Sequence, residues 1–265
     1  MRFVKRWLPI LLVALLCAAM LVFCVHKKPT VRRIQERGTL LVGTTGDYRP
    51  LTYRDSTGAY HGFCIELAGL IAERLGVDLT FVPTSWPTLT QDVLAEPQAF
   101  DLAMGGISIT DARCEIMAMS EGYLSNGKTI LCRSEDAGRF TSLAAIDQPG
   151  VRVMVNPGGL NEQFAQQNLS QATILVHPNN EEIPALVAAG EADVMITEIT
   201  EAPWYVQHEP YLAAPLLDQP FTHGEIGVLM RQVQDDLLDL VNRVIRTARS
   251  DGTLRRLSEK YGLRI

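Results

Sequence analysis

Short apolar stretches of strand length alternate with helical stretches along most of this 265-residue chain. In its first half, residues 39–43, 79–82 and 100–104 are predicted strands, and residues 65–75 and 89–94 are predicted helices between them. Such alternation is typical of mostly parallel sheets with flanking helices. The chain is therefore predicted to have an α/β fold.

The second half repeats this pattern, and no linker or low-complexity stretch separates the halves. Predicted strands cover 151–155, 174–176 and 192–196, predicted helices cover 161–168 and 183–189, and an amphipathic helical region over 236–261 is broken at Gly252. We therefore expect two α/β lobes with a ligand cleft between them. The predicted lobes are residues 34–128 with 222–265, and residues 129–221.

The N-terminal segment, residues 1–33, is predicted to lie outside the fold. Basic residues precede an unbroken apolar run over residues 8–25, which is typical of an export signal or a membrane anchor. The run is long for a cleaved signal and just long enough to span a bilayer. We expect a periplasmic protein, either exported or anchored to the inner membrane by this segment.

The charge and the cysteine content limit the kinds of partner and cofactor that the folded part is expected to bind. Residues 1–33 hold seven of the 24 basic residues and no acid, which leaves 17 basic against 30 acidic residues in the remainder. This balance disfavours nucleic acid or an anionic membrane as a partner of the folded part, although a homo-oligomer is compatible with it. Cys64, Cys114 and Cys132 have no zinc-site spacing, and neither do the histidines, so we expect no metal or other cofactor. Two of these cysteines could form a disulfide, but small buried apolar side chains are the favoured interpretation.

Two carboxylates, Glu198 and Glu201, follow the apolar stretch over 192–196. The end of a strand in an α/β sheet is where ligand contacts gather and the next helix begins. The acids could simply stabilise the positive end of that helix. Alternatively, one of them meets a ligand, as an ion-pair partner if ionised or as a proton donor if desolvation keeps it protonated.

A second candidate site combines Ser108 and Thr110 with Arg113, at a predicted helix start. A guanidinium can hold a carboxylate through two parallel hydrogen bonds, helped by neighbouring hydroxyl and backbone donors. The Gly-rich turn over 156–159 could likewise expose backbone donors to an anion. The alternatives are a solvated arginine and an ordinary turn.

The order of these motifs resembles the type II periplasmic solute-binding proteins for polar amino acids. The resemblance covers the chain from about residue 34 onward and rests on Gly62-Phe63 with Glu66-Leu67-Ala68, Gly106-Ile107-Ser108-Ile109-Thr110 with Arg113, Tyr123, Asn156-Pro157-Gly158-Gly159 and residues 192–197. It implies the two-lobed periplasmic-binding-protein type II fold with the ligand in the cleft between the lobes.

Several loops are similar to those of dehydratases in this family that act on cyclohexadienyl acids. The matching segments include residues 44–48, 83–87, 126–129, 175–178 and 219–221. The resemblance implies decarboxylating dehydration of prephenate to phenylpyruvate, or of arogenate to phenylalanine. The partner is then a small dianionic or zwitterionic cyclohexadienyl substrate.

The same resemblance implies roles for individual residues. Carried over by motif, Glu201 is the general acid, and Lys128 and Asn161 support it in the cleft. The expected substrate-binding residues are Arg113, Ser108, Thr110, Asp47, Tyr48, Trp86, Gly159 and Glu198.

Two positions depart from the family pattern. Leu160 replaces a Thr or Ser, and Glu198 replaces the Asp that commonly binds a ligand's ammonium group. An amino-acid-binding protein of an ABC transporter therefore stays open as a function. The long N-terminal apolar run keeps a membrane-tethered sensor domain open as well. Glu201 discriminates between them and the enzyme, because plain receptors more often carry an apolar or small residue there.

Overall fold

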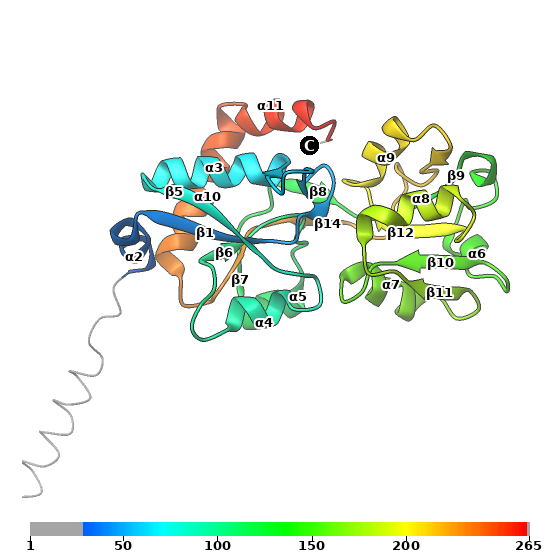
Figure 1. Cartoon of the computed structure of the whole chain (residues 1–265), viewed down its shortest axis with the longest axis horizontal. Coiled ribbons are helices and arrows are strands. Elements are labelled where there is room, and N and C mark those ends of the chain that lie inside the picture. The colour runs from blue at the N-terminus through cyan, green and yellow to red at the C-terminus, as the bar shows by residue number, and fades with distance from the viewer. Residues whose placement is uncertain (1–28, 264–265) are drawn as a thin grey trace, which may run out of the picture.

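The computed structural model describes residues 29–263 (Figure 1). Residues 1–28 of the predicted signal or anchor, which was expected over 1–33, lie outside the described residues, and that assignment stays a prediction. Among residues 29–263, no helix combines the length and apolar character needed to cross a membrane.

Helix α2 (Thr30–Arg37) is the first described element, and it belongs to the folded part. Ile34 is completely buried in the core of the first lobe. The backbone N–H of Val31 donates to Asp236 Oδ2 over 2.8 Å. Residues 30–33, which the sequence analysis assigned to the N-terminal segment, are therefore part of the fold.

Each lobe is built around one five-stranded sheet. The first sheet has the order β5 (Asp78–Pro83), β1 (Thr39–Thr44), β6 (Leu102–Ala103), β15 (Leu229–Met230), β7 (Ala118–Met119). The second has the order β11 (Thr173–Val176), β10 (Arg152–Val155), β12 (Val194–Glu198), β9 (Lys128–Arg133), β13 (Leu212–Ala213).

The α/β fold class is confirmed, with the refinement that both sheets are mixed. β1 pairs in parallel with β5 and β6, and β10 pairs in parallel with β11 and β12. β15 and β9 run antiparallel to their neighbours. Each of these two strands directly follows a crossing of the chain between the lobes.

The two crossings lie against each other. β8 (Leu124–Asn126) pairs antiparallel with β14 (Gly224–Ile226), just before β9 and β15. A Cβ atom on Gly127 would come within 2.1 Å of the Thr222 carbonyl oxygen, so only glycine fits between the two backbones. The predicted strand over 100–104 is shorter in the structure, where it is β6.

Helices cover both faces of each sheet (Figure 1). They are α3 (Phe63–Leu75), α4 (Leu89–Leu94), α5 (Asp111–Ile116), α6 (Leu143–Ile146), α7 (Leu160–Asn168), α8 (Ile183–Ala188), α9 (Ala202–His208), α10 (Asp235–Ser250) and α11 (Thr253–Lys260). Short elements are the 3₁₀ helices η1 (Ser134–Asp136) and η2 (Asn180–Glu182), and the strands β2 (Asp47–Tyr48), β3 (Thr52–Arg54) and β4 (Tyr60–His61). In α3 the apolar spacing puts Leu67, Ile71 and Leu75 into the first core, and Gly76 ends the helix in a left-handed conformation.

The described cysteines are unpaired. Cys64 and Cys132 are buried in the cores of the first and second lobe, whereas Cys114 is exposed.

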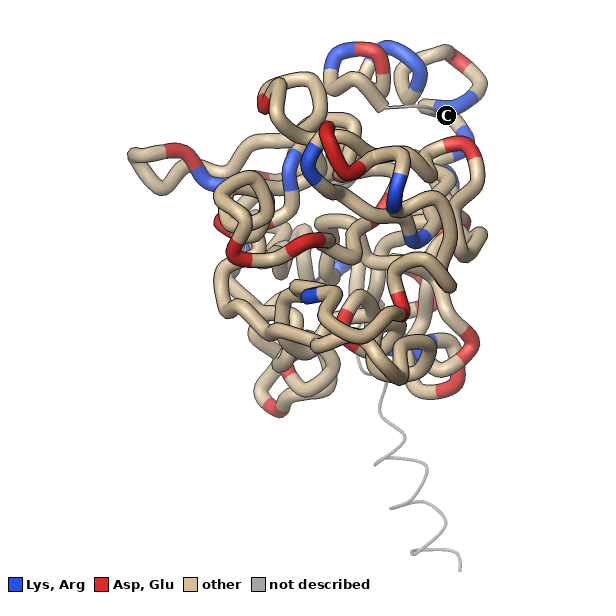
Figure 2. The backbone as a smooth tube through the Cα atoms, turned by 90° about the vertical axis from the view of Figure 1, so that its right-hand side faces the viewer, with Lys and Arg blue, Asp and Glu red and all other residues tan. Residues whose placement is uncertain are grey.

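In the view onto the second lobe, acidic and basic positions are interspersed along the backbone (Figure 2).

Candidate active site

A small cavity lies where the two lobes meet. It measures about 20 Å³ and is lined by Tyr48, Trp86, Gly106, Ser108, Arg113, Lys128, Asn156, Gly159, Leu160, Asn161 and Glu198. This volume admits about one water molecule, so a larger ligand can enter only when the lobes separate. An adjoining hollow of about 250 Å³ shares Ser108, Lys128, Leu160 and Glu198 with it and also contacts Thr110.

Lys128 and Glu198 form a buried ion pair at the centre of this cavity. They are direct partners in the antiparallel pairing of β9 with β12. Lys128 Nζ lies 2.6 Å from Glu198 Oε1 and 2.6 Å from Asn161 Oδ1. Burial alone would raise the pKa of Glu198, but the ammonium charge and hydrogen bonds from Lys128, Tyr48 and Asn126 hold it below its usual value. Lys128 therefore has Glu198, and not Glu201, as its carboxylate partner.

Glu198 also receives donors from the first lobe. The Tyr48 hydroxyl donates to Oε2, and Ser108 Oγ donates to Oε1 over 3.3 Å. Burial, followed by the Glu198 charge, raises the pKa of Tyr48, which keeps its hydroxyl protonated. Glu198 is the last residue of β12 and does not lie at a helix start. The interpretation that it stabilises a helix N-terminus is therefore wrong.

Glu201 is fully buried without an ion-pair partner among the described residues. Thr197 Oγ1 donates to its Oε2 over 2.5 Å, and Asn180 Nδ2 donates to its Oε1 over 2.7 Å. Desolvation raises the pKa of Glu201 to about 8, assisted by the Glu198 and Asp47 charges and opposed by these two hydrogen bonds. The side chain precedes α9 but makes no capping hydrogen bond, so it does not serve as a helix cap.

Glu201 does not line the closed cavity. Its carboxyl lies within electrostatic reach of Tyr48 and Glu198, which do line it. A ligand that contacts Glu201 must therefore extend the cavity toward this side chain.

Arg113 lines the cavity from α5. Thr110 caps this helix by accepting from the Arg113 backbone N–H over 3.3 Å, and Arg113 Nη1 donates to the Ser108 carbonyl over 2.5 Å. Burial lowers the pKa of Arg113, while the Glu198 charge raises it. The segment thus places one guanidinium at the wall of the cavity.

Two of the expected substrate-binding residues, Tyr48 and Trp86, form an aromatic wall of the cavity. Trp86 meets Tyr48 edge to face, with ring centroids 5.7 Å apart, and both rings line the cavity. Asp47 does not line it: its Oδ1 accepts from Trp86 Nε1 over 3.2 Å, and burial raises its pKa. Asp47 therefore orients a wall residue in the closed form.

The Gly-rich turn closes against the first lobe. Gly159 lies beside Asn156 and Trp86, and Gly158 has φ 73°. A Cβ atom on Gly158 would lie 2.5 Å from Pro87 Cα, a contact between the two lobes that cannot be relieved by moving a side chain. Leu160 gives this wall an apolar side chain where the family pattern has a hydroxyl.

Gly158→Ala is expected to hinder lobe closure and to raise KM at least about tenfold, because the new methyl group meets backbone of the opposite lobe. Gly150→Ala is the matched control, since φ is 85° there and no atom lies within 4 Å of the added Cβ. Equal KM values for the two variants would show that strain, and not closure, is responsible.

Four buried polar residues of this region escaped the sequence analysis as individual site residues. Asn156 lines the cavity, Asn126 donates to Ser108 Oγ over 3.3 Å, and Thr197 and Asn180 bind Glu201. Asn156 and Asn126 stand in motifs that were recognised. Asn180 lies in a polar stretch of the kind usually found on a protein surface, so nothing in the neighbouring sequence indicates that it is buried.

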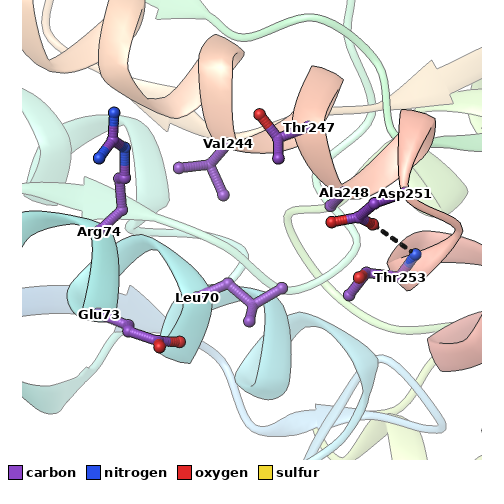
Figure 3. Close-up of a pocket in the computed structure, with 8 residues that line it drawn as sticks. All are labelled: Leu70, Glu73, Arg74, Val244, Thr247, Ala248, Asp251 and Thr253. Atoms are coloured by element: carbon purple, nitrogen blue, oxygen red, sulfur yellow. Dashed lines mark hydrogen bonds between the residues drawn. The ribbon is translucent and has the colours of Figure 1, made fainter.

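Another hollow of about 530 Å³ lies on the first lobe, between α3 and the α10–α11 corner (Figure 3). Asp251 accepts there from the Thr253 backbone N–H over 2.8 Å, which explains its position at the turn between the helices. This groove contains none of the predicted site residues. Within residues 29–263, no group of three or more His, Cys, Asp and Glu side chains is arranged to hold a metal ion.

Comparisons with known proteins agree on the family. The profile of the bacterial extracellular solute-binding proteins, family 3, matches residues 40–264. The cyclohexadienyl dehydratase of Pseudomonas aeruginosa is 41% identical over 250 residues, covering 94% of this chain and 92% of the relative. The L-cystine-binding protein of Escherichia coli (strain K12) is 29% identical over 231 residues, covering 87% of this chain and 85% of the relative.

Solved structures show the same mixture of binding proteins and enzymes. An ancestral amino acid-binding protein described as a precursor of cyclohexadienyl dehydratase is 35% identical, with a TM-score of 0.81, covering 88% of this chain and 99% of its own. A variant of an ancestral cyclohexadienyl dehydratase is 48% identical, with a TM-score of 0.55, covering 89% of this chain and 97% of its own.

Proposed function

The chain belongs to family 3 of the bacterial extracellular solute-binding proteins, and on this premise we propose that it is a decarboxylating dehydratase. Its substrates are prephenate, which gives phenylpyruvate, and arogenate, which gives phenylalanine. The observation that carries the proposal is Glu201, a fully buried acid with a pKa of about 8. Such a group is protonated at neutral pH and can donate that proton inside a closed cleft.

The proposed reaction has one difficult step, the departure of the ring hydroxyl. Glu201 protonates this oxygen as the C–O bond breaks, so that water leaves instead of hydroxide. The C–C bond to the ring carboxylate breaks, its electron pair completes the aromatic ring, and carbon dioxide leaves. Each turnover consumes one proton, which Glu201 regains from solvent when the lobes open. General acid catalysis of this kind contributes about 10²–10⁴-fold, or roughly 3–5 kcal/mol.

Other residues of the cleft support binding of a dianion. Arg113 is proposed to hold one substrate carboxylate, and Lys128 the second, together with Asn161. Glu198 neutralises part of the Lys128 charge and fixes its position. Tyr48 and Trp86 supply flat apolar surface for the ring.

The direct test uses purified protein lacking residues 1–28, mixed with prephenate or arogenate. We expect phenylpyruvate absorbance to appear with the first and phenylalanine with the second. Tight binding of a free amino acid, with no turnover of either compound, would instead identify a solute carrier, as several relatives are named.

The pH dependence follows from the protonation state of Glu201. The acid must be protonated to act, so kcat/KM is expected to be highest below about pH 8 and to fall as pH rises through that value. Above it, the loss approaches tenfold per pH unit. The measurement is a pH–rate profile between about pH 5 and 9.5, with circular dichroism to verify folding at each point. An increase of kcat/KM across pH 8 would contradict the role of general acid.

The family description, extracellular, supports export of the chain, and we propose that it works in the periplasm. Attachment to the inner membrane through residues 1–28 is a further proposal, which fractionation of cells that express the full chain would test.

A further inference from the structure

Asn180 lies at the seam between the lobes and is completely buried. Its single nitrogen, Nδ2, donates to two acceptors, Glu201 Oε1 over 2.7 Å and the Asp47 carbonyl over 3.1 Å. Glu201 follows β12 of the second lobe, whereas Asp47 begins β2 of the first. One amide group therefore touches the proposed general acid and the opposite lobe at the same time.

The Asp47 carbonyl fixes the orientation of the amide. A carbonyl oxygen only accepts hydrogen bonds, so the Asn180 nitrogen must face it, and the two hydrogens of this nitrogen can serve both acceptors together. A flipped amide would set its own oxygen against the Asp47 carbonyl. In agreement, Asn180 Oδ1 has no partner within the described part of the chain.

This orientation also determines where Glu201 carries its proton. Because the Asn180 nitrogen only donates, Oε1 must accept, and the acidic hydrogen belongs on Oε2. Oε2 faces the Thr197 hydroxyl, which can donate or accept by rotating. The general acid is thus held with one defined oxygen as the donor.

A neighbouring ion pair joins the same two segments across the lobes. Arg49, two residues after Asp47, binds Glu181, the residue after Asn180, with Nε and Oε1 2.7 Å apart. In an opening that separates the two lobes, residues 47–49 would move away from residues 180–181. The Asn180 amide then loses its orienting acceptor but keeps Glu201 within its own lobe.

We propose that Asn180 is a positioning residue that couples lobe closure to the orientation and proton location of Glu201. This inference rests on the proposed dehydratase function. It goes beyond that function because Asn180, which lies outside the substrate cavity, orients the Glu201 carboxyl when the lobes close.

The test compares Asn180→Ala with Thr197→Val, because Thr197 donates to Glu201 from β12 of the same lobe. Loss of either donor is expected to lower kcat about tenfold or more. It is also expected to raise the pKa of Glu201, which is read from the pH above which the rate falls. Only Asn180→Ala is expected to raise KM as well, and to shift the small-angle scattering of the ligand-bound protein toward an open form. Asn168→Ala, on the exposed end of α7, is the control and should match the wild type.

Asn180→Leu repeats the test with a side chain of similar size that has no donor and adds no charge, in case the alanine variant folds poorly. Carbon-13 NMR titration of Glu201 provides a readout that does not depend on turnover. If the wild type turns over neither substrate, the proposed function fails, but a shift of the scattering toward an open form in the Asn180 variants, and not in Thr197→Val, would still support the coupling. Wild-type kcat, KM and Glu201 titration in both Asn180 variants would overturn it.

Discussion

Glu201→Gln is expected to lower kcat by at least about a hundredfold while substrate binding is retained. The side chain is fully buried, and desolvation keeps it protonated up to about pH 8. Glutamine has the same shape as the protonated acid, and its carbonyl oxygen can still accept from Asn180 Nδ2. It has no acidic proton to transfer to a leaving hydroxyl, so only the rate of the chemical step should fall.

The measurement is steady-state kinetics with prephenate, combined with calorimetric titration of phenylpyruvate to follow binding. Glu259→Gln, an exposed position on α11, is the control for the same change of side chain. Wild-type turnover in the Glu201 variant would remove this residue from the role of general acid.

Stability provides an independent check on the ionisation of Glu201. Its pKa of about 8 in the folded protein exceeds the usual unfolded value of about 4.3. The stabilisation linked to its proton is therefore fully present below about pH 4.3 and is lost as pH rises through about 8. Glutamine does not titrate, so the free energy of unfolding of Glu201→Gln, relative to wild type, should increase between pH 5 and 8.

Lys128→Met is expected to lower the free energy of unfolding by about 3–5 kcal/mol, because it leaves the Glu198 carboxylate buried without its cation. The two charged groups lie 2.6 Å apart, and both residues are less than a tenth exposed. Urea unfolding at pH 7 measures the loss. Substrate binding should weaken in the same variant, because the second carboxylate of the substrate loses its proposed partner.

Two further variants isolate the buried pair as the cause. Lys260→Met removes an ion pair of the same length to Glu66, but the Lys260 side chain is 60% exposed, so the loss should stay below about 1 kcal/mol. Adding Glu198→Gln to Lys128→Met removes the unpaired charge and should restore most of the stability. If Lys128→Met were no more destabilising than Lys260→Met, the ion pair would not be a buried one in solution.

The sequence alone predicted the elements with a strong local signal. Residues 65–75 and 89–94 are helical as expected, because apolar spacing and flanking turn residues act within a few positions of each other. The order of polar motifs indicated the family, and it named the charged residues that gather around the cleft, including Arg113, Lys128 and Glu198.

Only the tertiary structure decided which of these residues meet. The antiparallel register of β9 on β12 sets Lys128 opposite Glu198, which leaves Glu201 with no cation bound to it among residues 29–263. Lobe closure brings Asn180 to Asp47 across 133 positions of sequence. The physical reason is that desolvation and ion pairing depend on distances in space, which the folding of the whole chain creates, whereas helix and strand preferences are encoded by near neighbours.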